Sequence, residues 1–284
     1  DVKAETDQIP ETKRERIALF RDSVDKILLQ LDAKQGPGMA VWVEVEGEVI
    51  YSKSAGLAQR EQRIPIDDNT TFELASASKP LTASLVLQLA ESGLLHLDDA
   101  AIKWLPELPP LWQTITIRHL LNQTAGIPDY MSQINATKLL GLDGLTNKQL
   151  MQRWQTNQHL NFFPGTQAEY SNSNYVVLAE IAASACGIGF GQCLRERIFE
   201  PLGMKNTFWE YDEVPKGSLA LGYRWINHEW VEEPMEHDEA YGAMGGMLTT
   251  IDDFAKYVAF HLSAWPERDE AEKGPVKRSS VREM

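Results

Sequence analysis

A serine and a lysine stand three positions apart, as Ser76 and Lys79, within residues 72–83. The segment is typical of a strand or loop that leads directly into a helix, and side chains at this spacing share one helix face. A serine hydroxyl becomes a strong nucleophile when a base removes its proton, and a buried lysine can lose its charge and act as that base. The partial positive charge of a helix N-terminus also favours negative charge on the reacting oxygen. Ser76 and Lys79 are therefore candidate catalytic residues.

The same spacing occurs a second time, at Ser23 and Lys26. Apolar residues recur at helical spacing around this copy, and no loop precedes it, so we predict an exposed helix face there. Ser76 differs from this copy because apolar residues precede it and because its neighbours Ala75 and Ala77 are small.

A serine hydrolase also needs groups that transfer protons and hold the substrate, and the best candidates are Tyr170 and Asn172. They form the only Tyr-x-Asn sequence in the chain and lie on a loop that contains glycine and proline. A phenol beside a cation could relay a proton to a leaving group. The alternative is a tyrosine and an asparagine that satisfy backbone groups of a loop.

Other chemistries find less support. There is no Gly-x-Ser-x-Gly sequence, which the nucleophile elbow of α/β-hydrolases would require. The six histidines form no metal-ligand spacing, and His228 and His237 are interpreted as solvated loop residues. Gly187, Gly189 and Gly191 follow a helix rather than a strand, so capping by Gly187 is preferred to a phosphate loop. We expect no cofactor and no metal.

Composition narrows the class of protein. The 284 residues carry a net charge of -14, which argues against nucleic acid as a partner, and no transmembrane segment is predicted. The two cysteines, Cys186 and Cys193, are expected to be buried free thiols rather than a bridge. The chain begins with Asp, which is consistent with a processed protein, and a periplasmic or secreted location is expected.

The elements that must position these residues can be placed along the chain. Residues 1–10 are predicted to be a flexible lead-in, followed by a helix over 11–33 and a hairpin of strands 39–45 and 48–52. Further helices are predicted over 80–93, 175–185, 190–199 and 254–262, with strand signals over 219–226. We predict one domain over 11–284 with two lobes, a sheet lobe from about 11–72 and a helical lobe from about 80–204.

Taken together, these motifs closely resemble the serine β-lactamase and DD-peptidase superfamily. The likeness is to the branch of class C β-lactamases, D-alanyl-D-alanine carboxypeptidases and related esterases, and it spans about residues 11–262. It rests on Ser76-x-x-Lys79, residues 120–128, residues 163–166 with Tyr170-Ser171-Asn172, residues 195–204 and residues 245–250 followed by Asp253. The resemblance implies an α/β fold of the α+β type, with an antiparallel sheet flanked by helices and an all-helical lobe.

The resemblance also implies a role for each matching residue. Ser76 would be the nucleophile that forms an acyl-enzyme, and its backbone N–H would supply half of the oxyanion hole. Lys79 would accept the serine proton, Tyr170 would act as general base and acid, and Asn172 would hydrogen-bond the substrate amide. Gln123 and Tyr130 are further candidates for substrate binding. Gln123 and Ala125 stand where many relatives have His and Ser, which leaves the fine substrate preference open.

A third family motif, Lys or His followed by a small residue and Gly, does not occur after Tyr170. We therefore expect the native polypeptide to continue past Met284, with the C-terminal strands of the sheet outside this chain. The expected function is hydrolysis of an amide, lactam or ester, with a D-alanyl peptide, a β-lactam or a small ester as substrate. A general hydrolase or peptidase is favoured over a dedicated β-lactamase. The alternative is a non-catalytic penicillin- or peptide-binding homologue, and the oligomeric state stays open.

Overall fold

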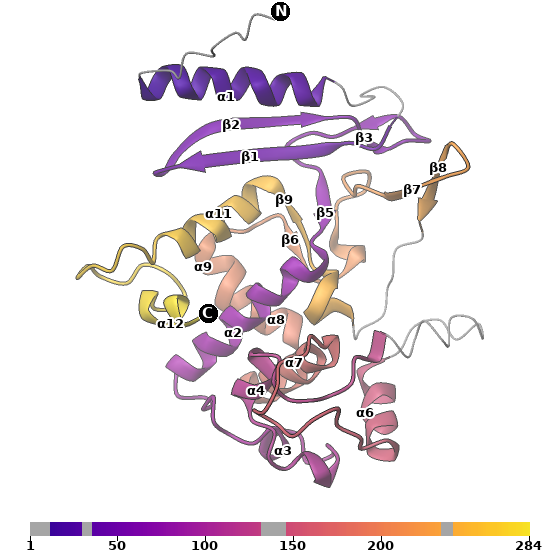
Figure 1. Cartoon of the computed structure of the whole chain (residues 1–284), viewed down its shortest axis with the longest axis vertical. Coiled ribbons are helices and arrows are strands. Elements are labelled where there is room, and N and C mark those ends of the chain that lie inside the picture. Colours follow the sequence, from indigo (N-terminus) through magenta and orange to yellow (C-terminus); the bar gives the residue numbers. More distant parts are fainter. Residues whose placement is uncertain (1–11, 30–35, 132–145, 234–240) are drawn as a thin grey trace, which may run out of the picture. The chain divides into compact units, whose positions relative to one another are not determined.

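A computed structural model describes residues 12–29, 36–131, 146–233 and 241–284. The chain forms two compact units. Figure 1 labels their helices and strands. The first unit comprises Asp1–Thr70 with Lys216–Pro234, and the second comprises Thr71–Pro215 with Met235–Met284. The antiparallel sheets and the helices match the predicted fold class of a β-lactamase-like α/β protein.

The described part of the first unit contains one helix and three antiparallel strand pairs. These are α1 (Lys13–Leu28), β1 (Met39–Val45) with β2 (Glu48–Ala55), β3 (Leu57–Gln59) with β4 (Ile64–Pro65), and β7 (Gly222–Ile226) with β8 (Glu229–Glu233). The predicted hairpin over 39–52 is confirmed, and its turn residues Glu46 and Gly47 have φ of 54° and 79°. Such positive values suit the tight turns that join antiparallel strands. Strand β8 was not predicted, because Glu229, Glu232 and Glu233 give it an acidic composition.

Helix α1 is shorter than the helix predicted over 11–33, and residues 30–33 of that prediction lie outside the described residues. It begins with a capping box between Thr12 and Glu15, which satisfies free N–H groups of the first turn. It is fastened to β2 through Asp25, which accepts hydrogen bonds from Tyr51 Oη and Lys53 Nζ. Ser23 of the second Ser-x-x-Lys copy is exposed, and its hydroxyl donates to the carbonyl of Leu19 at 2.7 Å.

The second unit holds a three-stranded antiparallel sheet and most of the described helices. The sheet order is β5-β9-β6, with β5 (Thr71–Glu73), β6 (Thr207–Phe208) and β9 (Leu248–Thr250). The helices are α2 (Ser78–Glu91), α3 (Ala101–Trp104), α4 (Ile117–Leu121), α6 (Asn147–Thr156), α7 (Asn172–Cys186), α8 (Phe190–Leu194), α9 (Glu200–Leu202), α11 (Ile251–Leu262) and α12 (Arg278–Glu283). Short 3-10 turns lie at Ala75–Ala77, Pro110–Trp112 and Tyr211–Glu213, and π-helical turns lie at Arg195–Phe199 and Gly242–Gly246.

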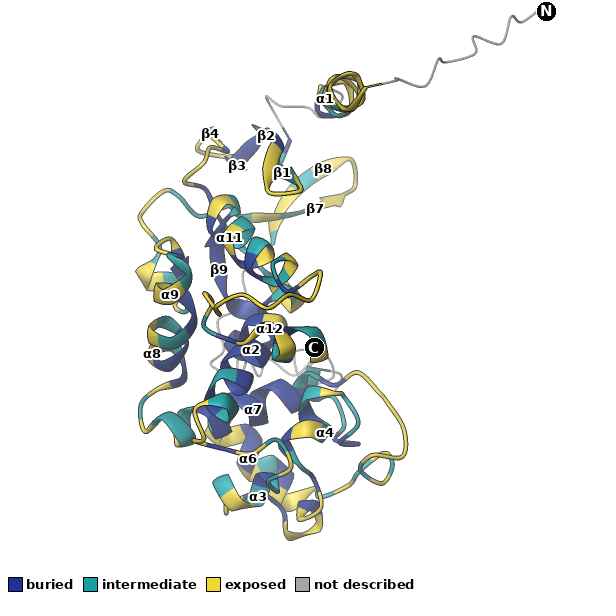
Figure 2. Cartoon of the chain, turned by 90° about the vertical axis from the view of Figure 1, so that its left-hand side faces the viewer, coloured by how far each residue is buried: buried dark blue, intermediate teal, exposed yellow. Residues whose placement is uncertain are grey.

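The core of this unit is centred on α2 and α7, which pack together and are mostly buried (Figure 2). Leu85 and Val86 of α2 and Val177 of α7 have no exposed surface. Burial of such a side chain contributes about 1.5–3 kcal/mol. The sequence predicted a helix over 80–93, and the structure buries even its polar residues Thr82 and Ser84, so α2 is a central helix. These two helices therefore form a rigid support for side chains at their N-termini.

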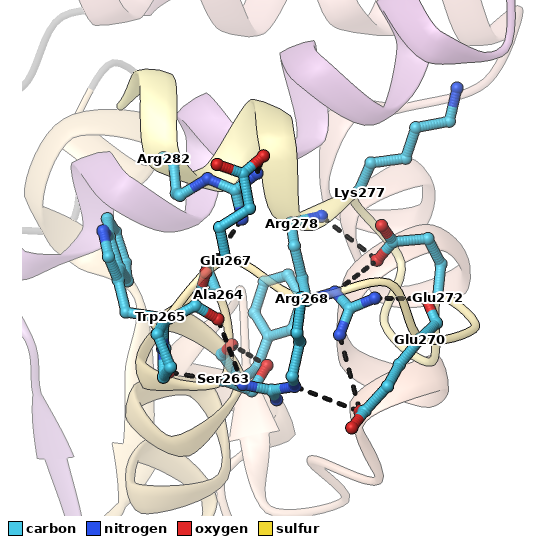
Figure 3. A network of polar contacts seen from close by, with 12 residues as sticks. Ser263, Ala264, Trp265, Glu267, Arg268, Glu270, Glu272, Lys277, Arg278 and Arg282 are labelled. Carbon is cyan, nitrogen blue, oxygen red and sulfur yellow. Dashed lines mark hydrogen bonds and ion pairs between the residues drawn. The ribbon is translucent and has the colours of Figure 1, made fainter.

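The segment after α11 is fastened by ion pairs and backbone contacts (Figure 3). Arg278 lies between Glu270 and Glu272, at 3.6 and 3.3 Å, and its side chain is only 10% exposed. Arg282 pairs with Glu267 at 2.9 Å. Charged partners for a largely buried arginine offset its desolvation, so these contacts hold α12 in place.

The expectation of free thiols is wrong, because the structure joins Cys186 to Cys193 as a disulfide. Helix α7 ends at Gly187, whose φ of 70° confirms the predicted cap, and the chain then turns into α8. This reversal brings the two Cα atoms to 6.3 Å, within the span that a disulfide bridges.

In the part of the chain that the structure describes, no single helix is long and apolar enough to cross a membrane. The segments Asn172–Cys186 and Phe190–Leu202 meet that test only as a pair, across a bend of 75°. The described residues also contain no group of three or more His, Cys, Asp or Glu side chains arranged to hold a metal ion.

Candidate active site

The chain enters the site from β5 through a strained turn. Leu74 follows β5, and its N–H donates to the carbonyl of Met247 at 2.8 Å. Ala75 has a φ of 47°, which is unfavourable for a residue with a Cβ atom. Strained residues of this kind are concentrated at functional sites. Here the turn presents Ser76 as an exposed side chain immediately before α2 begins at Ser78.

Lys79 lies in the first turn of α2 and is only 5% exposed. Its Nζ donates to Ser76 Oγ at 3.2 Å, to Asn172 Oδ1 at 2.8 Å and to the carbonyl of Met244 at 2.7 Å. Three acceptors match the three N–H bonds of an ammonium group. Burial lowers the pKa of Lys79 below its ordinary value, while Tyr170 and the charge of Asp129 oppose this shift. The group is therefore well hydrogen-bonded and easier to deprotonate than an exposed lysine.

Tyr170 approaches Ser76 from the loop before α7. Its Oη lies 2.8 Å from Ser76 Oγ, and Lys79 Nζ lies 4.9 Å from the centre of its ring. Tyr170 is 53% exposed, so its hydroxyl is accessible to a bound molecule. The structure thus brings Ser76, Lys79 and Tyr170 together in one hydrogen-bonded group.

Asn172 is the first residue of α7 and joins this group through Lys79. The other side of Asn172 faces Asp129, a half-buried residue on the loop after α4. Asp129 Oδ1 accepts from Asn172 N at 3.1 Å, and Asp129 Oδ2 accepts from Asn172 Nδ2 at 3.3 Å. Each carboxylate oxygen therefore contacts Asn172, and Asp129 Oδ1 also accepts from the N–H of Met131 at 3.4 Å.

Gln123 supports the start of α7 from the same loop. Its Oε1 accepts from Ser171 N at 2.9 Å and from Asn174 Nδ2 at 2.6 Å. It also lines a cavity of about 320 Å³, which Lys79, Tyr170 and Tyr175 line as well. Ser76 and Asn172 are not among the residues that line this cavity.

The prediction for Tyr130 is wrong in this structure. Its side chain is 1% exposed and belongs to the hydrophobic core, so a substrate cannot contact it. The physical reason lies in the loop: the N–H of Tyr130 donates to Ser173 Oγ at 3.0 Å, which fastens this residue against α7.

Two contributors to the site were missed at the level of sequence. The π-helical turn Gly242–Gly246 supplies the Met244 carbonyl to Lys79, and Thr82 Oγ1 fixes the turn by donating to the Ala243 carbonyl at 2.7 Å. A backbone carbonyl leaves no residue-type signal. Asp129 could have been found from its charge beside the glycine and proline of its loop.

The chain is similar to several known proteins. A model of the Beta-lactamase family matches residues 22–282. Penicillin-binding protein 4* of Bacillus subtilis (strain 168) is 38% identical over 163 residues, 57% of this chain and 35% of that protein. A beta-lactamase of Escherichia coli (strain K12) is 31% identical over 250 residues, 86% of this chain and 61% of that protein.

The structure of EstCE1, a hydrolase with promiscuous acyltransferase activity, superposes with a TM-score of 0.75 at 25% identity. That match covers 94% of this chain and 76% of EstCE1. The chain spans only 35% and 61% of the two curated relatives named above. Because the family model covers most of the chain and the beta-lactamase relative aligns over 86% of it, the chain belongs to the Beta-lactamase family.

Proposed function

We propose that the protein containing this chain is a serine hydrolase that forms an acyl-enzyme on Ser76. One observation carries the proposal: Ser76 Oγ lies within hydrogen-bonding distance of both Lys79 Nζ and Tyr170 Oη. A nucleophile in contact with a base and with a second proton carrier is the arrangement that acyl transfer needs.

The first half of the reaction forms the acyl-enzyme. Neutral Lys79 removes the proton of Ser76 as the serine oxygen bonds to the substrate carbonyl carbon. The carbonyl oxygen becomes negative, and the backbone N–H of Ser76 stabilises it. The tetrahedral intermediate then breaks its bond to the leaving nitrogen or oxygen, which takes a proton from Tyr170.

The second half releases the product. A water molecule gives a proton to Tyr170 and attacks the acyl carbon, and the bond to Ser76 Oγ breaks. The serine regains its proton from Lys79, so both the base and the nucleophile return to their starting state. Asn172 keeps Lys79 within reach of Ser76 throughout and hydrogen-bonds the substrate amide.

The substrate class is an amide, lactam or ester carbonyl, with D-alanyl peptides, β-lactams and small esters as its members. The names of the relatives, a penicillin-binding protein, a beta-lactamase and a hydrolase, support this class. We favour a general hydrolase or peptidase over a dedicated β-lactamase. The disulfide between Cys186 and Cys193 supports a periplasmic or secreted location, since disulfides persist in oxidising compartments.

The test is covalent labelling of the whole protein with a fluorescent penicillin and with a small activated ester, followed by intact mass measurement. We expect an acyl adduct with at least one of the two reagents, and none with the Ser76→Ala variant. Absence of any adduct on the wild-type protein, or an adduct that persists in Ser76→Ala, would refute the proposal.

The rival function is a binding protein that keeps the fold without turnover. Lys79→Ala separates the two, because removal of an essential base slows acylation by orders of magnitude. A binding protein would keep its ligand affinity and show no change in a covalent step.

A further inference from the structure

We propose that Asp129 is a positioning residue that sets the orientation of the Asn172 amide, so that Oδ1 and not Nδ2 faces Lys79. The inference rests on the proposed function, because this orientation matters for the reaction only if Lys79 acts on Ser76. Asp129 does not contact Ser76 in the contacts described above and acts through Asn172.

The geometry of one carboxylate carries the inference. Its two oxygens accept from the backbone N–H and the side-chain Nδ2 of the same residue, at 3.1 and 3.3 Å. With Nδ2 held on Asp129, the opposite end of the amide points to Lys79 Nζ at 2.8 Å. A rotated amide would place an NH₂ group against the ammonium and an oxygen against the carboxylate, and both contacts would be repulsive.

The carboxylate also acts on Lys79 through its charge. Lys79 is faced by Ser76 from the turn before α2, by Tyr170, Asn172 and the Tyr175 ring around the start of α7, and by the Met244 carbonyl. Burial lowers the pKa of Lys79, whereas Tyr170 and the charge of Asp129 raise it. Loss of the Asp129 charge should therefore lower the pKa of Lys79 and let it deprotonate at lower pH.

The loop itself does not depend on Asp129 alone. Ser173 Oγ accepts from the N–H of Tyr130 at 3.0 Å and donates to the carbonyl of Pro128 at 2.7 Å. These bonds fasten the same loop to α7 without touching the Asn172 amide. Ser173→Ala is therefore a matched control for a purely structural role.

The central variant is Asp129→Asn, which has one acceptor oxygen where the wild type has two. Asn172 must lose one hydrogen bond or rotate its amide. We expect acylation by a small activated ester to slow by about tenfold to a hundredfold, as misplacement of a reacting group does. The acid limb, which is the pH range over which the acylation rate rises with pH, should move to lower pH. Ser173→Ala should lower the unfolding temperature and leave that limb in place.

A swap of the two residues, Asp129→Asn with Asn172→Asp, tests orientation directly. The carboxylate introduced at position 172 would again offer an oxygen to Lys79, and its second oxygen would accept from the amide introduced at position 129. Above the Lys79 pKa, where the rate no longer depends on pH, we expect the swap to react faster than Asp129→Asn and than Asn172→Asp alone. Its acid limb should lie at higher pH than in the wild type, because the carboxylate at position 172 favours the charged amine. The small ester is the right probe, since it has no side-chain amide for Asn172 to bind.

The outcomes separate the two proposals. A wild type that forms no adduct contradicts the proposed function, and the Lys79 titration, followed by NMR of its side-chain nitrogen, then tests Asp129 by itself. The Lys79 pKa should fall in Asp129→Asn whether or not the protein reacts.

If Asp129→Asn fails to fold, the swap is compared with Asn172→Asp. An unchanged rate and an unchanged Lys79 titration in Asp129→Asn, or a swap no faster than Asn172→Asp, would overturn the inference.

Discussion

The hydroxyl oxygens of Ser76 and Tyr170 lie 2.8 Å apart, although 94 positions separate the two residues. Ser76 stands at the entry to α2, and Tyr170 stands just before α7. The packing of these two buried helices therefore sets the distance between the hydroxyls. Substitution of either residue therefore tests whether this hydrogen bond contributes to the reaction.

Tyr170→Phe removes the hydroxyl and keeps the ring beside Lys79. We expect acylation to slow by about a hundredfold to ten-thousandfold, the usual contribution of a positioned proton carrier. Stopped-flow measurement with the activated ester gives the rate. Tyr175→Phe is the control: burial raises the pKa of Tyr175 to about 12, so its phenol stays protonated near neutral pH. Equal losses in the two variants would contradict a specific role for Tyr170.

The acylation rate should depend on pH through Lys79. Its pKa lies below the ordinary value of 10.5 because burial disfavours the charged amine. The reactive form is the neutral amine, so the rate rises about tenfold per pH unit until pH passes the Lys79 pKa, and is then constant. Lys79→Arg keeps the charge at every accessible pH and should lose this limb together with most of the activity. A wild-type rate that does not vary with pH would exclude Lys79 as the base.

Sequence alone was sufficient for the parts of the site that local spacing determines. Ser76 and Lys79 meet because three positions correspond to about one helical turn, and Tyr170 and Asn172 were found through their motif and the family resemblance. The contact between Asp129 and Asn172 depends on how a loop folds back on α7, which no local pattern records. The burial of Tyr130 and the pairing of Cys186 with Cys193 likewise follow from tertiary contacts.

The hydrogen bond between Thr82 and the Ala243 carbonyl should stabilise the turn that holds Lys79. Thr82→Val keeps the size of the side chain but removes the donor in a site with no exposure. An unpaired buried acceptor costs about 1–3 kcal/mol, so the free energy of unfolding should fall by that amount. Denaturant unfolding measures it, with Thr82→Ser as the control that keeps the hydroxyl. A Thr82→Val midpoint equal to that of the wild type would show that this bond does not stabilise the fold.

The disulfide should be present in protein recovered from an oxidising compartment. Unfolding in denaturant without a reductant should leave Cys186 and Cys193 unlabelled by an alkylating reagent, and reduction should allow two labels. Closing a short loop, with a sequence separation of 7, stabilises a fold by about 2–3 kcal/mol. The double variant Cys186→Ser and Cys193→Ser should lose about that much. Two labels before reduction would show that the thiols are free in solution.

Gly126 is the glycine whose replacement should most disturb the site. Its φ is 79°, and a Cβ atom there would lie 2.3 Å from the carbonyl oxygen of Phe162, which is backbone and cannot turn aside. Gly126 lies in the loop that carries Gln123 and Asp129, and its own carbonyl accepts from Asn161 N at 2.8 Å. We expect Gly126→Ala to lower the free energy of unfolding by more than about 3 kcal/mol through strain and overpacking.

The matched control is Gly93→Ala. Gly93 has a similar φ of 71°, but a Cβ atom there would meet nothing within 4 Å. That variant bears only the penalty of the left-handed conformation, about 1–2 kcal/mol. The difference between the two variants in denaturant unfolding therefore isolates the contact with Phe162. Equal destabilisation would mean that the loop moves away from Phe162, and the acylation rate of Gly126→Ala would then report whether Asp129 moves with it.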